Sequence, residues 1–178
     1  KVHLYPTTIR TLDLGGDKTA SLFGLAQEAN PFLGLRGIRL SLEQPEVFRA
    51  QARALVRAAA HGRLRVLLPV IGGVEEVRRA RALILEATAN YEEAIAEYQA
   101  AIQINPNIPT LYIGLGLNYR ILQVYDQAIT AFTRANALNP ADPFPDQGTD
   151  YSFSEAEKRR PPTVGALGHD HPSRRCQQ

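Results

Sequence analysis

The chain has 178 residues, 44% of them apolar, which is enough for one or two folded domains and excludes a disordered polymer. Its 20 Lys and Arg face 18 Asp and Glu, so the charge balance gives no reason to expect a nucleic-acid or membrane-surface partner. No apolar stretch approaches the roughly 20 residues that span a bilayer. With a single cysteine, Cys176, and no secretory leader pattern, we expect a cytoplasmic protein. The absence of Met, even at position 1, suggests a piece of a longer reading frame.

Residues 1–86 alternate strand and helix patterns. Runs rich in β-branched and aliphatic residues at Val2–Tyr5 and Thr8–Leu14 predict short strands. Pro45–His61 carries apolar residues at helical spacing and predicts an amphipathic helix. The nearly all-apolar run Leu64–Ile71 predicts a strand buried on both faces of a parallel sheet. This order favours βαβ units with two to three parallel strands, which form only part of a sheet.

Residues 87–143 contain an internal repeat, in which every matched pair of positions is separated by the same offset. Seven positions match, namely Tyr91, Ala94, Ile95, Tyr98, Ala101, Asn105 and Pro106 with Tyr125, Ala128, Ile129, Phe132, Ala135, Asn139 and Pro140. Small alanines where helices approach and a proline after the second helix resemble the tetratricopeptide repeat, whose period equals this offset. The matched alanines and aromatic residues are therefore expected to be core positions.

The second repeat is complete, because the family's first-helix positions hold Leu115, Gly116 and Tyr119. The first repeat borrows its first helix, residues 74–89, from the preceding segment. One more step of the same offset reaches Thr149, Asp150 and Phe153, of which two do not match the pattern. We therefore expect about two helical hairpins, followed by a mostly irregular, flexible tail at 144–178.

Two arginine motifs stand out in the first part of the chain, TIRTLDLGGDK at 8–18 and NPFLGLRGIR at 30–39. Together with 64–71 and 74–78, they resemble the phosphoenolpyruvate-binding domain of enzyme I of the sugar phosphotransferase system and related phosphoenolpyruvate-utilising enzymes. This resemblance implies a segment of a (β/α)8 barrel. It also implies that Arg10 and Arg36 hold the phosphate of phosphoenolpyruvate.

Arginine suits this role because its planar guanidinium pairs with two phosphate oxygens at once, whereas lysine supplies only a point charge. Asp13 and Lys18 are second candidates, for orienting the two arginines. The alternative is that these arginines are solvated surface charges, the ordinary state of this residue. The motif match favours phosphate binding for Arg10 and Arg36, and the ordinary interpretation is kept for Arg39, Arg49, Arg53 and Arg57 on the polar faces of helices.

The machinery that the resemblance implies for phosphoryl transfer is incomplete. Acidic residues for Mg2+, a proton-donating cysteine and a phospho-accepting histidine domain are not matched, so we assign no catalytic residue and expect Mg2+ only if a complete site is assembled. His169 and His171 lie near Cys176, but no helix or strand is predicted to hold them, so no metal site is expected.

The repeat region suggests a different class of function. In tetratricopeptide proteins the first helices line a groove for extended peptides, which corresponds here to Thr110, Ile113, Leu117 and Arg120. The main hypothesis is a protein-interaction module at 87–143 fused to a truncated phosphoenolpyruvate-binding segment at 1–86, not catalytic by itself. The alternative is a fragment of a phosphoenolpyruvate-protein phosphotransferase that binds the phosphate through two arginines and needs another chain for activity. The expected fold is mixed α/β followed by all-α, in a composite or chimeric chain.

Overall fold

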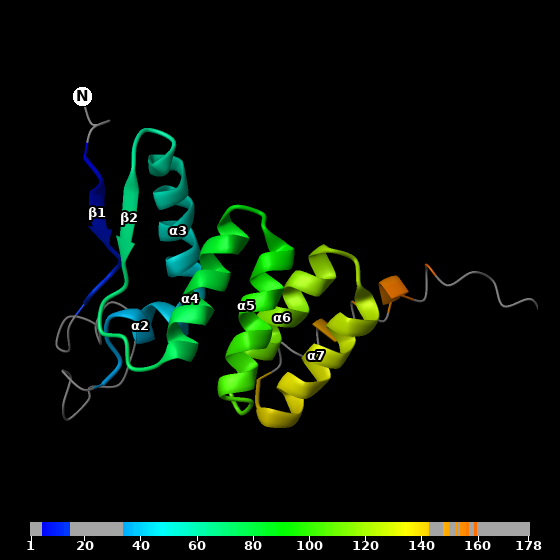
Figure 1. Cartoon of the computed structure of the whole chain (residues 1–178). Coiled ribbons are helices and arrows are strands. Elements are labelled where there is room, and N and C mark those ends of the chain that lie inside the picture. The colour runs from blue at the N-terminus through cyan, green and yellow to red at the C-terminus, as the bar shows by residue number, and fades with distance from the viewer. Residues whose placement is uncertain are drawn as a thin grey trace, which may run out of the picture.

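The computed structural model describes residues 5–14, 34–142, 148–149, 152, 154–156 and 159. The described chain is mostly helical with a two-stranded parallel sheet (Figure 1). Its elements are β1 (Thr7–Arg10), α2 (Ile38–Glu43), α3 (Pro45–Ala59), β2 (Leu64–Leu67), α4 (Val74–Ala87), α5 (Tyr91–Ile104), α6 (Pro109–Ile121) and α7 (Tyr125–Leu138). Within the described residues, no helix is both long and apolar enough to cross a membrane.

The two strands run parallel, with Thr7 opposite Leu64 and Arg10 opposite Leu67. This confirms the strand, helix, strand order for the described residues, although each strand is shorter than predicted. The expectation that the second strand is buried on both faces is wrong, since the side chains of Val66 and Leu67 remain 38% and 45% exposed. The apolar sequence predicted that both faces of β2 would be covered in a larger parallel sheet. Among the described residues, β2 pairs with β1 alone. The predicted strand at Val2–Tyr5 lies mostly outside them.

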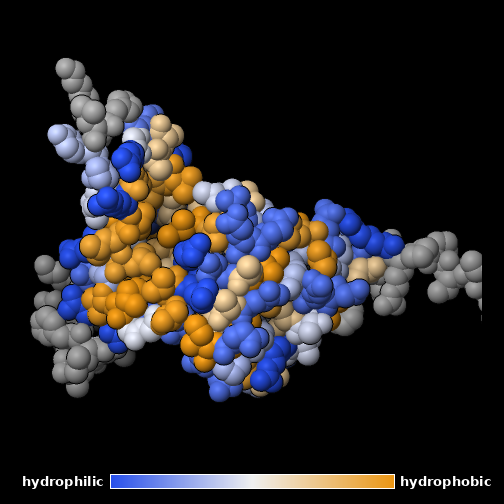
Figure 2. All heavy atoms as spheres, in the orientation of Figure 1, coloured by the Kyte–Doolittle hydropathy of each residue, from blue (hydrophilic) through white to orange (hydrophobic). Residues whose placement is uncertain are grey.

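An apolar surface results from this arrangement. Figure 2 shows hydrophobic side chains gathered over the strands and the adjoining helices. Exposed apolar residues there lie on β2, in the loop that follows it and at the start of α4, namely Val66, Leu67, Val70, Ile71 and Val74. Such exposure is unusual for a parallel strand, because both faces of parallel sheets are normally covered.

Helix α3 has the predicted amphipathic pattern. Pro45 occupies its first turn, where a missing N–H costs no hydrogen bond. Phe48, Ala52 and Leu55 face inward at helical spacing. Phe48 packs with residues of α2 and α4 in one core cluster, whose buried members are Ile38, Leu42, Phe48, Ala80 and Leu83. The helices of the first segment are thereby joined to α4.

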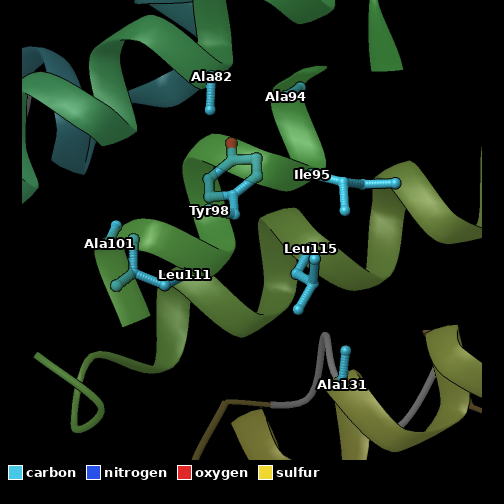
Figure 3. Packing of buried hydrophobic residues seen from close by; sticks show 8 residues of the cluster. All are labelled: Ala82, Ala94, Ile95, Tyr98, Ala101, Leu111, Leu115 and Ala131. Carbon is cyan, nitrogen blue, oxygen red and sulfur yellow. The ribbon is translucent and has the colours of Figure 1, made fainter. Parts of the chain in front are cut away.

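A second core cluster joins α4 to α7 (Figure 3). Its buried members are Ala82, Ala94, Ile95, Tyr98, Ala101, Leu111, Leu115 and Ala131. Gly114 lies against the ring of Tyr98 and Gly116 against that of Phe132, so closely that a methyl group at either position would collide with the ring. Gly116 thus allows close helix packing, and the matched alanines are buried as expected, together with Tyr98, Tyr125 and Phe132, whereas Tyr91 is only partly buried.

The turns between paired helices repeat with the same offset as the sequence. Ala89 and Gln123 both have positive φ, 59° and 64°. The next residue in each turn donates its N–H back into the preceding helix, from Asn90 to the Leu85 carbonyl at 3.0 Å and from Val124 to the Tyr119 carbonyl at 2.9 Å. The α4–α5 turn therefore has the same conformation as the α6–α7 turn, as expected if α4 serves as a first helix.

Helical packing continues beyond residue 143, where the sequence pattern predicted an irregular tail. Ser152 Oγ donates to the Gly148 carbonyl at 2.8 Å, as Asn118 Nδ2 donates to the Gly114 carbonyl at 2.7 Å. Both pairs are buried, and the repeat offset relates one pair to the other. Two of the leucine, glycine and tyrosine positions of the repeat do not match here. What recurs is a different glycine, Gly114 or Gly148, and the side chain that donates to its carbonyl, Asn118 or Ser152.

Candidate functional site

Two places in the described structure bring together the residues that the sequence singled out. The first is the carboxyl edge of the strands. Because β1 and β2 are parallel, Arg10 and Leu67 end them at the same edge. The Ile38 N–H donates to the Pro69 carbonyl at 2.9 Å, which brings the start of α2 to this edge as well.

Gly37 makes this connection possible. Its φ is +57°, and a Cβ atom there would lie 2.8 Å from the Pro69 carbonyl oxygen. Only glycine is compatible with both conditions, since side chains clash with the backbone in this conformation and no space is available for a methyl group. The role of Gly37 was not predicted from the sequence, because the close approach to Pro69 depends on a contact between distant segments.

Asp13 holds both candidate arginines. Its Oδ1 lies 3.2 Å from Arg36 Nη2 and its Oδ2 lies 3.5 Å from Arg10 Nη1. The side chain of Asp13 is 10% exposed and that of Arg36 is 20% exposed, whereas Arg10 is 63% exposed. One carboxylate between two guanidinium groups holds both of them and fixes their orientation relative to each other.

The loop that carries Asp13 is tied to the helices. Thr11 donates its N–H to the Leu67 carbonyl at 3.0 Å, and Leu12 donates its N–H to Gln51 Oε1 of α3 at 3.2 Å. Gln51 is thus a positioning residue that the sequence analysis missed, and its place on the strand side of an amphipathic helix was the available signal. Lys18 lies outside the described residues.

The described residues do not form a Mg2+ site. No group of three His, Cys, Asp or Glu side chains is close enough to hold a metal ion in the described part of the chain. At the carboxyl edge, both oxygens of Asp13 already face guanidinium groups. The segment with His169, His171 and Cys176 lies outside the described residues.

The second place is a cavity of about 290 Å³ lined by residues of α2, α3, α4, α5 and α6, here called the junction cavity. Three of the predicted groove residues line it, namely Thr110, Ile113 and Leu117. Arg120, the fourth, is not among its lining residues. The lining also includes Arg49 of α3 and Arg79 of α4. Residues of the repeat segment and arginines of the preceding segment thus line the same cavity.

Arg49 corrects one sequence expectation. It was interpreted as a solvated charge, yet its side chain is 19% exposed and its Nε lies 3.0 Å from Glu86 Oε2. Burial lowers the pKa of Arg49, but attraction and hydrogen bonding to Glu86 outweigh burial, so the pKa is raised overall. Helical periodicity predicted the exposed face of α3, and it cannot reveal a carboxylate contributed by α4.

Glu86 also accepts two hydrogen bonds from the repeat helices. Its Oε1 accepts from Tyr98 Oη at 2.9 Å and from Asn118 Nδ2 at 2.7 Å. Burial, followed by the charge of Glu86 and the hydrogen bond to it, raises the pKa of Tyr98 well above its usual range. One carboxylate therefore joins α3, α4, α5 and α6 beside the junction cavity.

Comparison with known proteins identifies two families. Residues 1–111 match the family described as "PEP-utilising enzyme, PEP-binding domain", and residues 109–142 match the tetratricopeptide repeat. Both predicted resemblances are confirmed, and the first extends beyond residue 86.

Among similar curated proteins is the "Phosphoenolpyruvate-protein phosphotransferase" of Priestia megaterium, 43% identical over 99 residues, which are 56% of this chain and 17% of the relative. Proteins with the same description from Staphylococcus carnosus and Staphylococcus aureus are 51% and 49% identical over 82 residues, which are 46% of this chain and 14% of each relative. The chain thus spans less than a fifth of the length of these relatives.

Proposed function

The chain belongs to the phosphoenolpyruvate-utilising enzymes through its PEP-binding domain, and on this premise we propose that it binds the phosphate of phosphoenolpyruvate through Arg10 and Arg36. The observation that supports this proposal is the pairing of Asp13 with both arginines. In this proposal the segment is a fragment of a phosphoenolpyruvate-protein phosphotransferase, and residues 1–86 are part of a (β/α)8 barrel.

The chemistry follows from the geometry of the pair. The phosphate of phosphoenolpyruvate carries up to two negative charges, and two guanidinium groups offer parallel N–H donors to its oxygens. Arg36 is held in place by a largely buried carboxylate, while Arg10 is exposed to incoming ligand. A segment with these residues binds and orients the phosphate. Phosphoryl transfer requires a metal and a nucleophile from residues beyond those described.

The test is calorimetric titration of phosphoenolpyruvate into the purified chain and into Arg10→Ala and Arg36→Ala variants. Arg53→Ala is the matched control, because Arg53 is an exposed arginine of α3. We expect each site variant to weaken binding at least tenfold and the control to leave it unchanged. Binding that is equal in all four proteins would exclude the arginine pair as the phosphate site. Inorganic phosphate and pyruvate, titrated separately, identify which end of the ligand is recognised.

A second function is proposed for the repeat segment, assigned to residues 87–143 with a first helix shared at 74–89. We infer that this segment binds an extended peptide of a partner protein, because Thr110, Ile113 and Leu117 line one cavity. Its test is peptide binding by the Leu117→Lys variant, in which a charge replaces an apolar cavity wall. Binding that survives this change would place the peptide elsewhere.

A further inference from the structure

Val70, in the loop that follows β2, has a backbone conformation that is rare for its residue type. Its φ is 56°, in the left-handed region, where a branched side chain crowds the neighbouring backbone. The other described residues with positive φ, glycine apart, are Ala89 and Gln123, which lie in the turns between paired helices and are not β-branched. A strained residue persists only where its surroundings hold it, and such residues cluster where ligands are bound.

The chain is anchored on both sides of Val70. Before it, the Pro69 carbonyl accepts a hydrogen bond from the Ile38 N–H at 2.9 Å, which ties the loop to the start of α2 (Figure 1). After it, the Gly72 N–H donates to Glu76 Oε2 of α4 at 2.6 Å. The loop therefore has fixed ends, and these contacts, rather than the preference of valine, impose the φ of Val70.

The side chain of Val70 lies against Gly37. A Cβ atom on Gly37 would lie 3.0 Å from both Cβ and Cγ2 of Val70. Gly37 itself has a φ of 57°, so two left-handed residues from distant segments pack against each other. Because glycine has no side chain, the methyl group of Val70 can contact the backbone of Gly37 directly.

This contact lies next to Arg36. Gly37 follows Arg36 in the chain, so holding Gly37 fixes the backbone from which the Arg36 side chain extends. The other end of that side chain is held by Asp13, whose Oδ1 lies 3.2 Å from Arg36 Nη2. An arginine held at both ends loses little conformational freedom when it binds an anion, and this preorganisation strengthens binding.

We propose that Val70 is a positioning residue for Arg36, which packs against Gly37 and fixes the backbone of Arg36 for phosphate binding. This inference rests on the proposed binding of phosphoenolpyruvate and adds to it a residue that acts through Gly37. The branched side chain that holds Gly37 is also the one that the left-handed conformation disfavours. Stability and affinity therefore respond in opposite directions to a change at position 70.

The experiment measures the affinity for phosphoenolpyruvate by calorimetry and the thermal midpoint by circular dichroism in the same full-length proteins. Val70→Gly adopts a positive φ freely but lacks the side chain against Gly37. We expect it to bind about fivefold more weakly than the wild type, the scale of ordering one long side chain on binding. Val70→Ala keeps a Cβ atom beside Gly37, so it should bind more tightly than Val70→Gly. Its thermal midpoint should be the lower of the two, since alanine is strained at this φ.

Ile71→Ala is the matched control, because Ile71 is the next residue of the loop and is 40% exposed, as Val70 is. It should leave the affinity for phosphoenolpyruvate unchanged. The readout that a merely structural role would not produce is the opposite order of the glycine and alanine variants at position 70. In that order, the variant with the higher thermal midpoint is the weaker binder.

Equal affinity of the wild type and Val70→Gly would overturn the positioning role and leave phosphate binding by the arginines intact. Affinity that follows the thermal midpoint, with Val70→Ala the weaker binder, would also overturn it, because Val70 would then act through stability alone. A loss in Ile71→Ala as large as that in Val70→Gly would assign the effect to the apolar loop as a whole. Absence of binding by the wild-type chain would overturn both this inference and the proposed function.

Discussion

Glu86 of α4 and Arg49 of α3 form an ion pair with 3.0 Å between Oε2 and Nε, and their side chains are only 11% and 19% exposed. The same carboxylate accepts hydrogen bonds from Tyr98 of α5 and Asn118 of α6. Because it serves both the helices that precede the repeats and the repeat helices themselves, Glu86 couples the two segments mechanically. The carboxyl edge of the strands and the junction cavity are therefore expected to depend on one another's folding.

The first prediction concerns the stability of this junction. Replacing Glu86 with Ala leaves a largely buried guanidinium without its carboxylate and removes two hydrogen bonds, so the free energy of unfolding should fall by about 3 kcal/mol. Urea unfolding followed by circular dichroism measures this change. Glu92→Ala, on the exposed first turn of α5, is the control and should change stability by less than about 0.5 kcal/mol. Equal effects of the two variants would contradict the role assigned to Glu86.

The second prediction follows from the raised pKa of Tyr98. Burial, then the charge of Glu86 and its hydrogen bond, keep the phenol protonated in the folded state. The unfolded chain releases this proton near pH 10, so above that pH the folded state binds more protons and stability falls as pH rises. The loss approaches about 1.4 kcal/mol per pH unit at most.

The measurement is urea unfolding at several pH values between 9 and 11. Tyr98→Phe should lose about 1 kcal/mol at neutral pH through the missing hydrogen bond, yet its stability should fall less steeply above pH 10. Tyr5→Phe is the matched control, because Tyr5 is 82% exposed. Parallel curves for the wild type and Tyr98→Phe would show that the phenol does not titrate differently in the two states.

The third prediction concerns Gly37. Alanine at this position meets the Pro69 carbonyl oxygen at 2.8 Å in a backbone conformation with φ of +57°, so Gly37→Ala should destabilise the chain by about 1–3 kcal/mol. Gly72→Ala is the control, since its nearest atom, a Glu76 carboxylate oxygen, lies at an ordinary 3.5 Å. If Gly37→Ala is as stable as Gly72→Ala, the contact between α2 and the end of β2 is not tight in solution.

Local and periodic features were predictable from the sequence. The fixed repeat offset placed the buried alanines and aromatic residues, and the spacing of Phe48, Ala52 and Leu55 predicted α3. Features that depend on a contact between distant segments were not. Gly37 matters because Pro69 lies beside it, and Arg49 is buried because α4 supplies Glu86. The exposure of β2 was not predicted, because its apolar sequence is typical of a strand inside a larger sheet, whereas the described residues form a sheet of two strands.

The candidate sites divide in the same way. Both arginine motifs were visible in the sequence, but the bridging of Arg10 and Arg36 by Asp13 required the fold. The repeat pattern suggested Thr110, Ile113 and Leu117, whereas the arginines that line the same cavity were not predicted, because their position depends on how the helices pack. Sequence therefore identified residue types and spacing, and the structure added the charge balance around them.

The fourth prediction distinguishes the geometry of Arg36 from its charge. Arg36→Lys keeps one positive charge but loses the planar pair of donors, so binding of phosphoenolpyruvate should weaken about tenfold. Arg53→Lys is the control and should leave binding unchanged, because Arg53 is exposed on α3. Calorimetry measures both. Full affinity in Arg36→Lys would mean that the site senses charge alone, as a diffuse basic patch does.

The fifth prediction tests whether helical packing after α7 contributes to stability. Ser152 is fully buried, and its hydroxyl donates to the Gly148 carbonyl at 2.8 Å, while a Cβ atom on Gly148 would lie 3.0 Å from the Phe132 ring. Ser152→Asp would bury an unpaired charge against this packing and should lower the free energy of unfolding by about 2–3 kcal/mol. Ser154→Asp is the matched control, because Ser154 is exposed and belongs to the same helical stretch.

Residues 148 and 152 occupy the positions of Gly114 and Asn118 one repeat later. A loss of stability confined to Ser152→Asp would therefore establish that they cover the end of α7, as the first helix of a further repeat would. Equal stability of the two variants, measured by urea unfolding, would mean that the repeat packing ends with α7, as the sequence pattern alone indicated.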